Sequence, residues 1–301
     1  AGLGWRACFL INVPIGVLAL ALTPRLIPKS PRQTGAKIDL GGTLLATATL
    51  TAIVLPLVEG RQHGWPPWTW ISLGMAPVLL AAFVLHQHRL SRRSGGQLVD
   101  LALFRVRSFS AGLVTQLCFW AGQASFFVVL ALYLQQGRGL HPLPAGLVFT
   151  ILAGAYLVAS AVAPALGERH GRAVIAWGAL VLACGHALLV AAVADIGVHG
   201  SLAVLAPGLL LVGAGMGLVL APLAGTILQA LEPERAGAAS GMLATMQNVG
   251  NAVGVAITGV IFFGSLHGGY AHAFELAVGE LAVLLVCVAA LTRLLPSRPR
   301  R

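Results

Sequence analysis

The sequence predicts an all-α polytopic membrane protein with about nine membrane-spanning helices. Of its 301 residues, 57% are hydrophobic and only 9% are charged, which is more apolar surface than a soluble core of this size can bury. Apolar runs recur at about the 20 residues that a helix needs to cross about 30 Å of hydrocarbon. The runs lack the alternation of apolar and polar residues that a β-barrel strand shows, so helices are the expected spanning elements.

The expected spans are separated by short polar breaks. In chain order they cover residues 6–24, 39–58, 68–88, 108–134, 143–166, 173–194, 201–228, 238–264 and 272–294.

The basic residues predict how these spans are oriented. If the first span starts outside, the inner connectors hold all of the 19 Lys and Arg except Arg6, Arg61 and Arg138. This asymmetry is what the positive-inside rule describes, and it places the C-terminus in the cytoplasm. Tryptophans near the expected outer ends agree with it: Trp5, Trp65, Trp68 and Trp70. The net charge of +10 is therefore a topology signal, and no nucleic-acid partner is expected.

Two motifs give the chain a family resemblance. Residues 4–16, GWRACFLINVPIG, resemble the GWRxxFxINxPIG segment that enters the sixth span in the 14-span drug:proton antiporter branch of the major facilitator superfamily. Residues 235–241 and 248–256 are similar to the thirteenth span of the same branch. The chain begins at Ala1 without an initiator Met, and no signal peptide explains this start. The resemblance implies that five spans precede it.

The same resemblance implies three parts. Residues 1–37 hold the last helix of a truncated N-terminal bundle and a cytoplasmic linker, 38–107 hold two linker helices and an inner loop, and 108–301 form a C-terminal six-helix transporter bundle. The linker helices show no strong polar feature and are expected to be spacers. His86 and His88 precede Arg89 at an inner helix end, which suits interfacial snorkelling better than metal binding.

Amide and aromatic side chains in the fourth and eighth spans predict a substrate pocket. In lipid, amide groups need a partner, which another helix, a water-filled cavity or a substrate can supply. Helix-to-helix hydrogen bonding therefore stays open as the alternative. The pocket candidates are Gln116, Trp120, Gln123, Phe127, Gln247, Asn248 and Asn251.

The inner loop between the fifth and sixth spans, residues 164–173, resembles a degenerate copy of the superfamily's cytoplasmic GxLaDrxGrr loop. Glu168 occupies the Asp position, while Pro164 and Ala173 depart from the pattern. Such a loop can supply a charge pair that holds the inward gate closed; a plain solvated loop is the alternative. The gate candidates are Glu168, Arg169, Gly171 and Arg172.

Glycines mark the seventh and eighth spans. In the seventh, a Gly-rich stretch precedes Pro222, which predicts close packing and then a kink, with gating as the alternative. In the eighth, small residues let a neighbouring backbone approach, although a role in rocking or in a substrate path stays open. The helix-packing candidates there are Gly237, Gly241, Gly250 and Gly254.

Ionisable residues inside the spans are few and are candidates for proton coupling. Glu280 lies about 12 Å of helix rise beyond His272, so it should reach below the outer headgroup layer. Glu275 sits nearer the surface, and hydration from an outer vestibule is the alternative account for both carboxyls. His186 lies near the middle of the sixth span, where it is either a neutral, internally bonded histidine or a proton carrier.

No cofactor, metal or enzymatic activity is expected. The four cysteines lie singly in different spans, and neither a phosphate-binding loop nor a GxSxG motif occurs. The resemblance implies proton-coupled efflux of drugs or other small molecules across the inner membrane by alternating access. The expected partners are membrane lipid, protons, a small-molecule substrate, and the missing N-terminal bundle or another chain. An accessory or split-half membrane protein that works only when assembled with another chain is the alternative.

Overall fold

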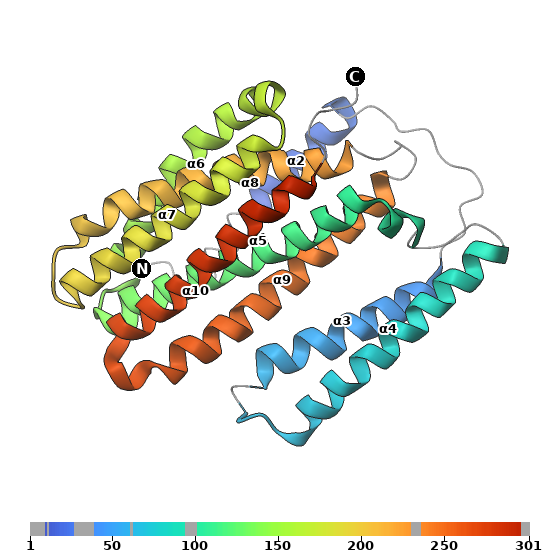
Figure 1. Ribbon diagram of the computed structural model, residues 1–301, viewed down its shortest axis with the longest axis horizontal. Helices are drawn as coiled ribbons and strands as arrows, with labels where there is room; N and C mark the ends of the chain where they lie inside the picture. Colours follow the sequence, from blue (N-terminus) through green and yellow to red (C-terminus); the bar gives the residue numbers. More distant parts are fainter. Residues whose placement is uncertain are drawn as a thin grey trace. The chain divides into compact units, whose positions relative to one another are not determined.

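The computed structural model describes residues 10, 12–26, 39–60, 63–93, 101–229 and 236–295. Contacts divide the chain into two units, Ala1–Ile38 and Asp39–Arg301. Every regular element in the described ranges is helical, which confirms the all-α class (Figure 1).

The first unit contains the helix α2, Asn12–Leu26. The hydroxyl of Thr23, the residue before Pro24, donates to the Ala19 carbonyl at 2.7 Å. This hydrogen bond lies within α2 itself. The described helix is shorter than the predicted span 6–24, whose start lies outside the described residues. Most of the motif at residues 4–16 precedes α2 and lies outside them as well.

The second unit contains eight long helices. They are α3 (Leu40–Glu59), α4 (Pro67–Arg93), α5 (Arg107–Leu132), α6 (Pro142–His170), α7 (Ala173–Ile196), α8 (Ala206–Leu228), α9 (Ala236–Gly264) and α10 (Gly269–Leu291). Short helical segments are η1 (Leu101–Arg105), the π-helical η2 (Tyr133–Gly137), η3 (Leu202–Leu205), η5 (Leu266–Gly268) and η6 (Thr292–Leu294). Among the described residues, eight helices are long and apolar enough to cross a membrane, and each coincides with a predicted span.

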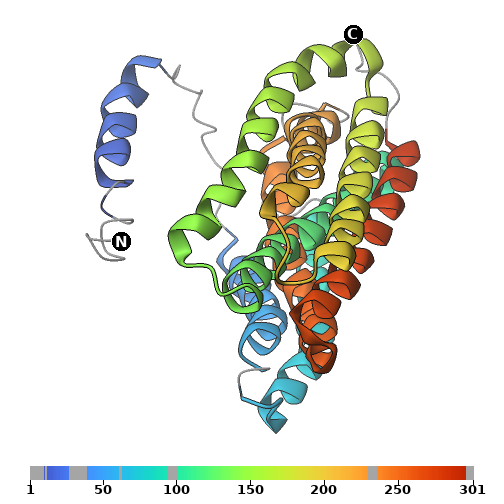
Figure 2. The same ribbon diagram turned by 90° about the vertical axis from the view of Figure 1, so that its left-hand side faces the viewer.

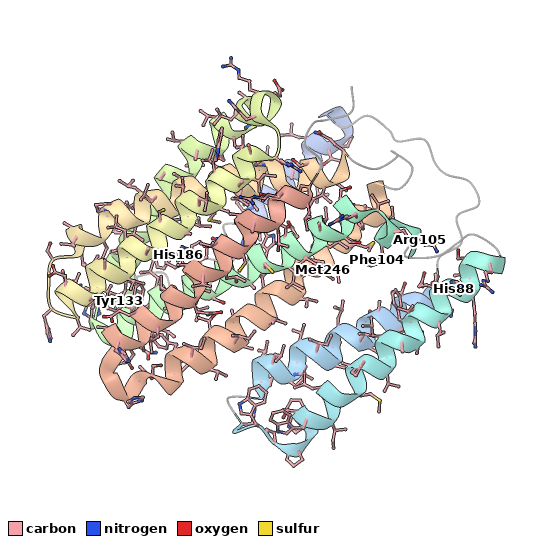
Figure 3. The ribbon with its side chains drawn as sticks, in the orientation of Figure 1. His88, Phe104, Arg105, Tyr133, His186 and Met246 are labelled. Atoms are coloured by element: carbon pink, nitrogen blue, oxygen red, sulfur yellow. The ribbon has the colours of Figure 1, made fainter. Side chains whose placement is uncertain are left out.

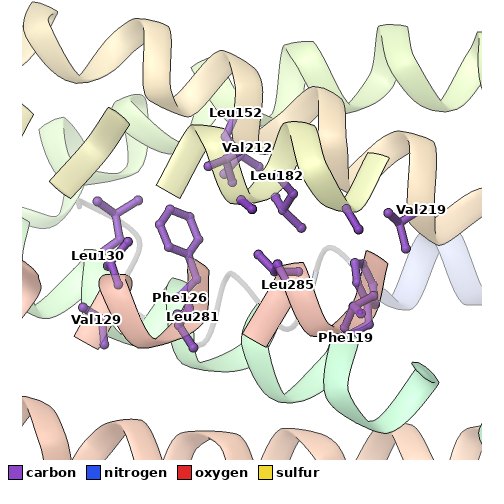
Figure 4. Packing of buried hydrophobic residues seen from close by; sticks show 14 of the residues in the cluster. Phe119, Phe126, Val129, Leu130, Leu152, Leu182, Val212, Val219, Leu281 and Leu285 are labelled. Carbon is purple, nitrogen blue, oxygen red and sulfur yellow. The ribbon is translucent and has the colours of Figure 1, made fainter. Parts of the chain in front are cut away.

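Helices α5 to α10 pack as one bundle with two neighbourhoods. In one, α8 packs against both α6 and α7; in the other, α5 packs against α9 and α10. The contact between α7 and α10 joins them, as the two perpendicular views show (Figures 1 and 2). At this junction Phe126 of α5, Leu182 of α7 and Leu285 of α10 are fully buried, and Leu182 and Leu285 point toward each other (Figure 4).

Glycines set the spacing between α8 and its neighbours. A Cβ added at Gly215 would lie 2.6 Å from the Leu182 nitrogen of α7, and one at Gly217 would lie 2.8 Å from the Ala159 Cβ of α6. Lipid offers no hydrophobic drive between helices, so close backbone contact must supply the association. The Gly-rich stretch of the seventh predicted span is thus a packing surface, and α8 continues through Pro222 to Leu228.

Helices α3 and α4 form a hairpin, and α3 also packs against α9. At one end, the Trp65 amide donates to the Gly60 carbonyl at 2.7 Å, and the Trp65 and Trp70 rings lie 5.6 Å apart. At the other end, Asp39 is hydrogen-bonded to His86 at 2.9 Å and to Gln87 at 2.7 Å. The expectation that the linker helices carry no strong polar feature is therefore wrong. His86 lies at a helix end, as predicted, but it also bonds Asp39 of the other helix. The sequence did not indicate this contact, because the two residues are 47 positions apart.

Candidate functional site

A carboxyl group within a predicted span is the first element of the candidate site. Glu280 of α10 is half-buried, and its Oε2 accepts a hydrogen bond from the Thr258 hydroxyl of α9 at 3.1 Å. Thr258 is only 1% exposed. A threonine hydroxyl donates to a carboxylate and can equally accept from a carboxylic acid. The pair can therefore stay hydrogen-bonded whether Glu280 is charged or neutral.

Four of the predicted pocket residues share a face of α5. Gln116, Trp120, Gln123 and Phe127 are spaced by three and four residues, which places them along one side of a helix. Gln123 is 1% exposed, yet within the described part of the chain neither its amide nitrogen nor its oxygen has a hydrogen-bond partner. The indole nitrogen of Trp120 is also buried and unpartnered there.

The pocket candidates of α9 lie in two environments. The Asn251 side-chain oxygen is buried and has no partner among the described residues. Asn248 is exposed, and its amide nitrogen donates to the Ala244 carbonyl of its own helix at 3.0 Å. Gln247 is half-buried. Asn251, like Gln123, therefore has a buried polar atom without a described hydrogen-bond partner. Asn248 instead forms a hydrogen bond within its own helix.

Two glycines bring Asn251 close to α5. A Cβ added at Gly250 would lie 2.5 Å from the Leu117 carbonyl oxygen, and one at Gly254 would lie 2.5 Å from the Ala121 Cα. The α5 and α9 backbones therefore touch on both sides of Asn251. Gly237 and Gly241 are exposed, and within the described residues nothing lies within 4 Å of a Cβ built at either. Of the four predicted packing glycines, Gly250 and Gly254 contact α5, whereas Gly237 and Gly241 contact no other described helix.

His186 of α7 is buried at the bundle centre (Figure 3). Its Nδ1 lies 2.8 Å from the Leu182 carbonyl oxygen, an acceptor, so Nδ1 carries a hydrogen. Its Nε2 is buried without a partner in the described ranges. The ring meets Phe126 of α5 edge-on, with centroids 4.7 Å apart. This geometry suits an internally bonded histidine, and the proton-carrier role of His186 stays a prediction, as does that of the half-buried Glu275.

The inner loop between α6 and α7 makes a contact that differs from the predicted charge pair. Gly171, at a φ of 57°, ends α6 with its amide donating to the Gly167 carbonyl at 2.8 Å. Arg172 Nη1 then donates to the carbonyls of Arg293 at 2.6 Å and Leu295 at 2.5 Å, at the end of α10. Glu168 and Arg169 are exposed, and Glu168 forms no ion pair within the described residues. The gate role of this loop stays a prediction.

Sequence analysis missed a polar contact at the opposite end of the bundle. The Tyr133 hydroxyl donates to the Gly197 carbonyl at 2.5 Å, while Arg138 donates to the Tyr133 hydroxyl at 3.3 Å and to the Gly200 carbonyl. These contacts connect η2, which follows α5, to the segment between α7 and η3; Tyr133 is labelled in Figure 3. The sequence feature that could have indicated this contact is Arg138 itself, because it is one of only three Lys or Arg residues on the expected outer side.

Comparisons with known proteins identify the family. The Major Facilitator Superfamily description matches residues 40–255 and 112–301. The "Probable actinorhodin transporter" of Streptomyces coelicolor is 37% identical over 270 residues, 88% of this chain and 46% of that protein. "Multidrug resistance protein Stp" of Mycobacterium tuberculosis is 31% identical over 86% of this chain and 47% of its own length. "Cephamycin export protein CmcT" of Amycolatopsis lactamdurans is 34% identical over 99% and 62%.

The chain spans about half the length of the first curated relatives that it matches. The resemblance to drug exporters predicted from residues 4–16 and 235–256 is confirmed at the level of the family. This multi-pass membrane protein belongs to the Major Facilitator Superfamily, a family of transporters and not of enzymes.

Proposed function

We propose that this chain is part of a proton-coupled exporter of drugs or other small molecules that works by alternating access in the cell's inner membrane, with its C-terminus in the cytoplasm. The relatives named for actinorhodin, multidrug resistance and cephamycin export support this substrate class. Because the chain spans about half the length of the first curated relatives that it matches, we propose that it acts together with an N-terminal bundle. In this proposal 1–37 ends that bundle, 38–107 is the linker part, and 108–301 is the C-terminal transport bundle.

The single observation that carries the proposal is the hydrogen bond between Thr258 and Glu280, at 3.1 Å. An ionisable residue inside a membrane span is costly, so it defaults to a functional role. Proton uptake by Glu280 removes a charge from the interface between α9 and α10 while Thr258 keeps a partner. One protonation event there can thus change how favourably these two helices pack, which is what coupling requires.

The buried polar groups of α5 and α9 support the proposed substrate class. A buried polar group without a partner costs about 1 to 3 kcal/mol, and such groups occur at Trp120, Gln123 and Asn251. A bound substrate can satisfy them. The stacked rings of Phe127 and Phe149, 5.9 Å apart, add a flat apolar surface, so a ligand combining ring systems with hydrogen-bonding groups fits this face.

The test uses everted membrane vesicles from cells that make the complete transporter containing this chain. Dye or antibiotic accumulation and the substrate-induced release of protons are measured together. We expect Glu280→Gln to reduce both to background at unchanged expression. Thr258→Val should weaken coupling, whereas Thr258→Ser, which keeps the hydroxyl, should behave as the unmodified protein. Full proton-coupled export by Glu280→Gln would contradict the proposal.

An accessory or split-half membrane protein is the second candidate. Here the chain works only when assembled with another chain. Producing the 301 residues with an N-terminal bundle from a relative, once fused into one chain and once as a separate chain, separates the two, because only the assembly role predicts export from the separate chains. Export by the 301 residues alone would eliminate the assembly requirement.

A further inference from the structure

One carboxylate at the end of the α3–α4 hairpin receives three hydrogen bonds. Asp39, the N-cap of α3, has a side chain only 4% exposed. Its Oδ1 accepts from the Gly42 amide at 2.7 Å and from His86 Nε2 at 2.9 Å, and its Oδ2 accepts from the Gln87 side-chain amide at 2.7 Å. One donor belongs to α3 and two to α4. The carboxylate therefore caps one helix and binds the other, and we call this set of four residues the Asp39 clasp.

Two glycines of α3, Gly41 and Gly42, leave space for the side chains of the clasp. A Cβ added at Gly42 would collide with Asp39 Oδ2 and with the amide nitrogen of Gln87. One at Gly41 would lie 3.1 Å from His86 Cε1. By contrast, within the described residues nothing lies within 4 Å of a Cβ added at Gly74, in the N-terminal third of α4. The two consecutive glycines thus fit the clasp, while Gly74 offers a matched control on the same hairpin.

The hairpin is joined by polar contacts at two further levels. The Ser72 hydroxyl of α4 donates to the Ala52 carbonyl of α3 at 3.1 Å. At the far end, the Trp65 amide donates to the Gly60 carbonyl in the connecting turn. Two helices that merely fill space in lipid do not need fixed polar contacts at both ends and in the middle. Their presence indicates that the relative position of α3 and α4 matters.

The hairpin also packs on the bundle formed by α5 to α10. Contacts assign everything from Asp39 onward to one compact unit, and α3 packs against α9 within it. Helix α9 carries Asn251 and Thr258 of the candidate site. The position of α3 consequently constrains α9, the helix whose Thr258 donates to the Glu280 carboxyl group.

We propose that Asp39 is a positioning residue whose clasp locks α3 to α4 and makes the hairpin a rigid brace on α9. Lipid supplies no hydrophobic drive that would hold two apolar helices together, so polar contacts and close packing determine their relative position. Loss of the carboxylate leaves Gly42, His86 and Gln87 without their common acceptor. The ends of α3 and α4 then separate, and the contact of α3 with α9 loosens.

The experiment measures distances between spin labels in the purified 301-residue chain, reconstituted in lipid nanodiscs with its cysteines replaced. One label pair at the exposed residues Leu40 and Leu85 reports on α3 against α4, and another at Leu40 and the exposed Ser240 reports on α3 against α9. We expect one narrow distance for each pair. Asp39→Asn and Gly42→Ala should each broaden both distributions, whereas Gly74→Ala should change neither.

A pH series distinguishes the carboxylate's role from a general effect on folding. The unmodified chain should lose its narrow Leu40–Leu85 distance at acid pH, and Asp39→Asn should show no such transition. His86 is the titratable group that faces Asp39 among the described residues, so His86→Phe, which removes one donor, serves as a milder variant if Asp39→Asn does not insert. Because the readout is a distance, failure of the transport proposal leaves this test intact.

Two results would overturn the inference. Narrow distributions in both Asp39→Asn and Gly42→Ala would show that the clasp does not lock the hairpin. Broadening of the α3–α4 distance with an unchanged α3–α9 distance would show that the hairpin does not brace α9.

Discussion

At the scale of single residues, what distinguishes the candidate site is where polar side chains find their partners. Several hydroxyls in the spans bond the carbonyl four residues earlier in their own helix, as Thr49, Thr115 and Ser125 do. Such local bonds need no tertiary structure. Glu280 instead accepts from another helix, while Gln123 and Asn251 keep buried atoms without partners in the described ranges. Together with Trp120 and His186, these residues keep hydrogen-bonding capacity that no described partner uses, or use it across helices.

Asp39 gives a prediction on pH. Burial raises its pKa, but the hydrogen bonds from Gly42, His86 and Gln87 outweigh burial and hold the pKa below the ordinary 3.8. Since the folded pKa lies below the unfolded one, the stabilisation is fully present above 3.8 and is lost as pH falls through the folded pKa. The melting temperature of the unmodified chain should therefore fall more steeply below pH 3.8 than that of Asp39→Asn. Parallel curves from pH 7 downward, measured by scanning fluorescence, would contradict this.

Arg138 gives a second residue-scale prediction. Its guanidinium donates to the Gly200 carbonyl and to the Tyr133 hydroxyl, which in turn donates to the Gly197 carbonyl. A hydrogen bond to a charged group contributes about 1.5 to 3 kcal/mol, so Arg138→Ala should lower the free energy of unfolding by an amount in that range. Arg169→Ala is the control, because Arg169 is an exposed residue at the other end of the bundle. Equal stability of the two variants in a denaturant titration would remove the assigned role.

At the scale of helices, contact surfaces made of small residues determine which elements touch. Gly250 and Gly254 face the α5 backbone, and Gly215 and Gly217 bring α8 against α7 and α6. Without a hydrophobic drive in lipid, these close contacts take the place of a buried apolar interface. The position of Asn251 beside α5 follows from the two glycines that flank it.

The glycine pairs of α9 give a matched test. Gly254→Ala places a Cβ against the Ala121 backbone, and overpacking of this kind costs about 1 to 3 kcal/mol. Gly241→Ala on the same helix meets open space in the described residues and should be neutral or stabilising by up to about 1 kcal/mol, because alanine favours the helix. The difference is measured by unfolding the 301-residue chain in detergent. Equal losses in both variants would mean that the α5–α9 contact is not the cause.

At the scale of the whole second unit, polar contacts secure the bundle at both ends. Arg172 connects the α6–α7 loop to the end of α10, and Tyr133 with Arg138 connects the end of α5 to the segment after α7. The middle of the bundle is packed with apolar side chains such as Phe126 and Leu285. Polar contacts therefore hold the bundle at both ends, and apolar packing holds it between them.

The basic residues predict which end faces the cytoplasm. His170, in the inner loop by the charge pattern, and His141, at the opposite end of α6, are both exposed. In a cysteine-free background, a membrane-impermeant maleimide applied to intact cells should label His141→Cys and leave His170→Cys unlabelled until the cells are opened. The reverse labelling would contradict the orientation and the cytoplasmic C-terminus.

Much of the fold was predictable from local sequence. The predicted span 39–58 corresponds to α3 at Leu40–Glu59, and 143–166 corresponds to α6 at Pro142–His170. Hydropathy suffices here because the bilayer imposes one length and one polarity on every span. The site was less predictable. Depth in the span marks Glu280 as a candidate, whereas nothing in the sequence marks Thr258, because its contact depends on the rotation of α9 relative to α10.

The all-helical class, the positions of eight spans and the membership of the Major Facilitator Superfamily follow from the amino-acid sequence, because apolar length and short motifs are local properties of the chain. Which polar residues meet follows from the packing of the helices: Thr258 with Glu280 across 22 residues, and Asp39 with His86 across 47. The packing also determines that Gly250 and Gly254, and not Gly237 and Gly241, touch another described helix. These outcomes depend on the rotation and register of packed helices, which neither composition nor periodicity records.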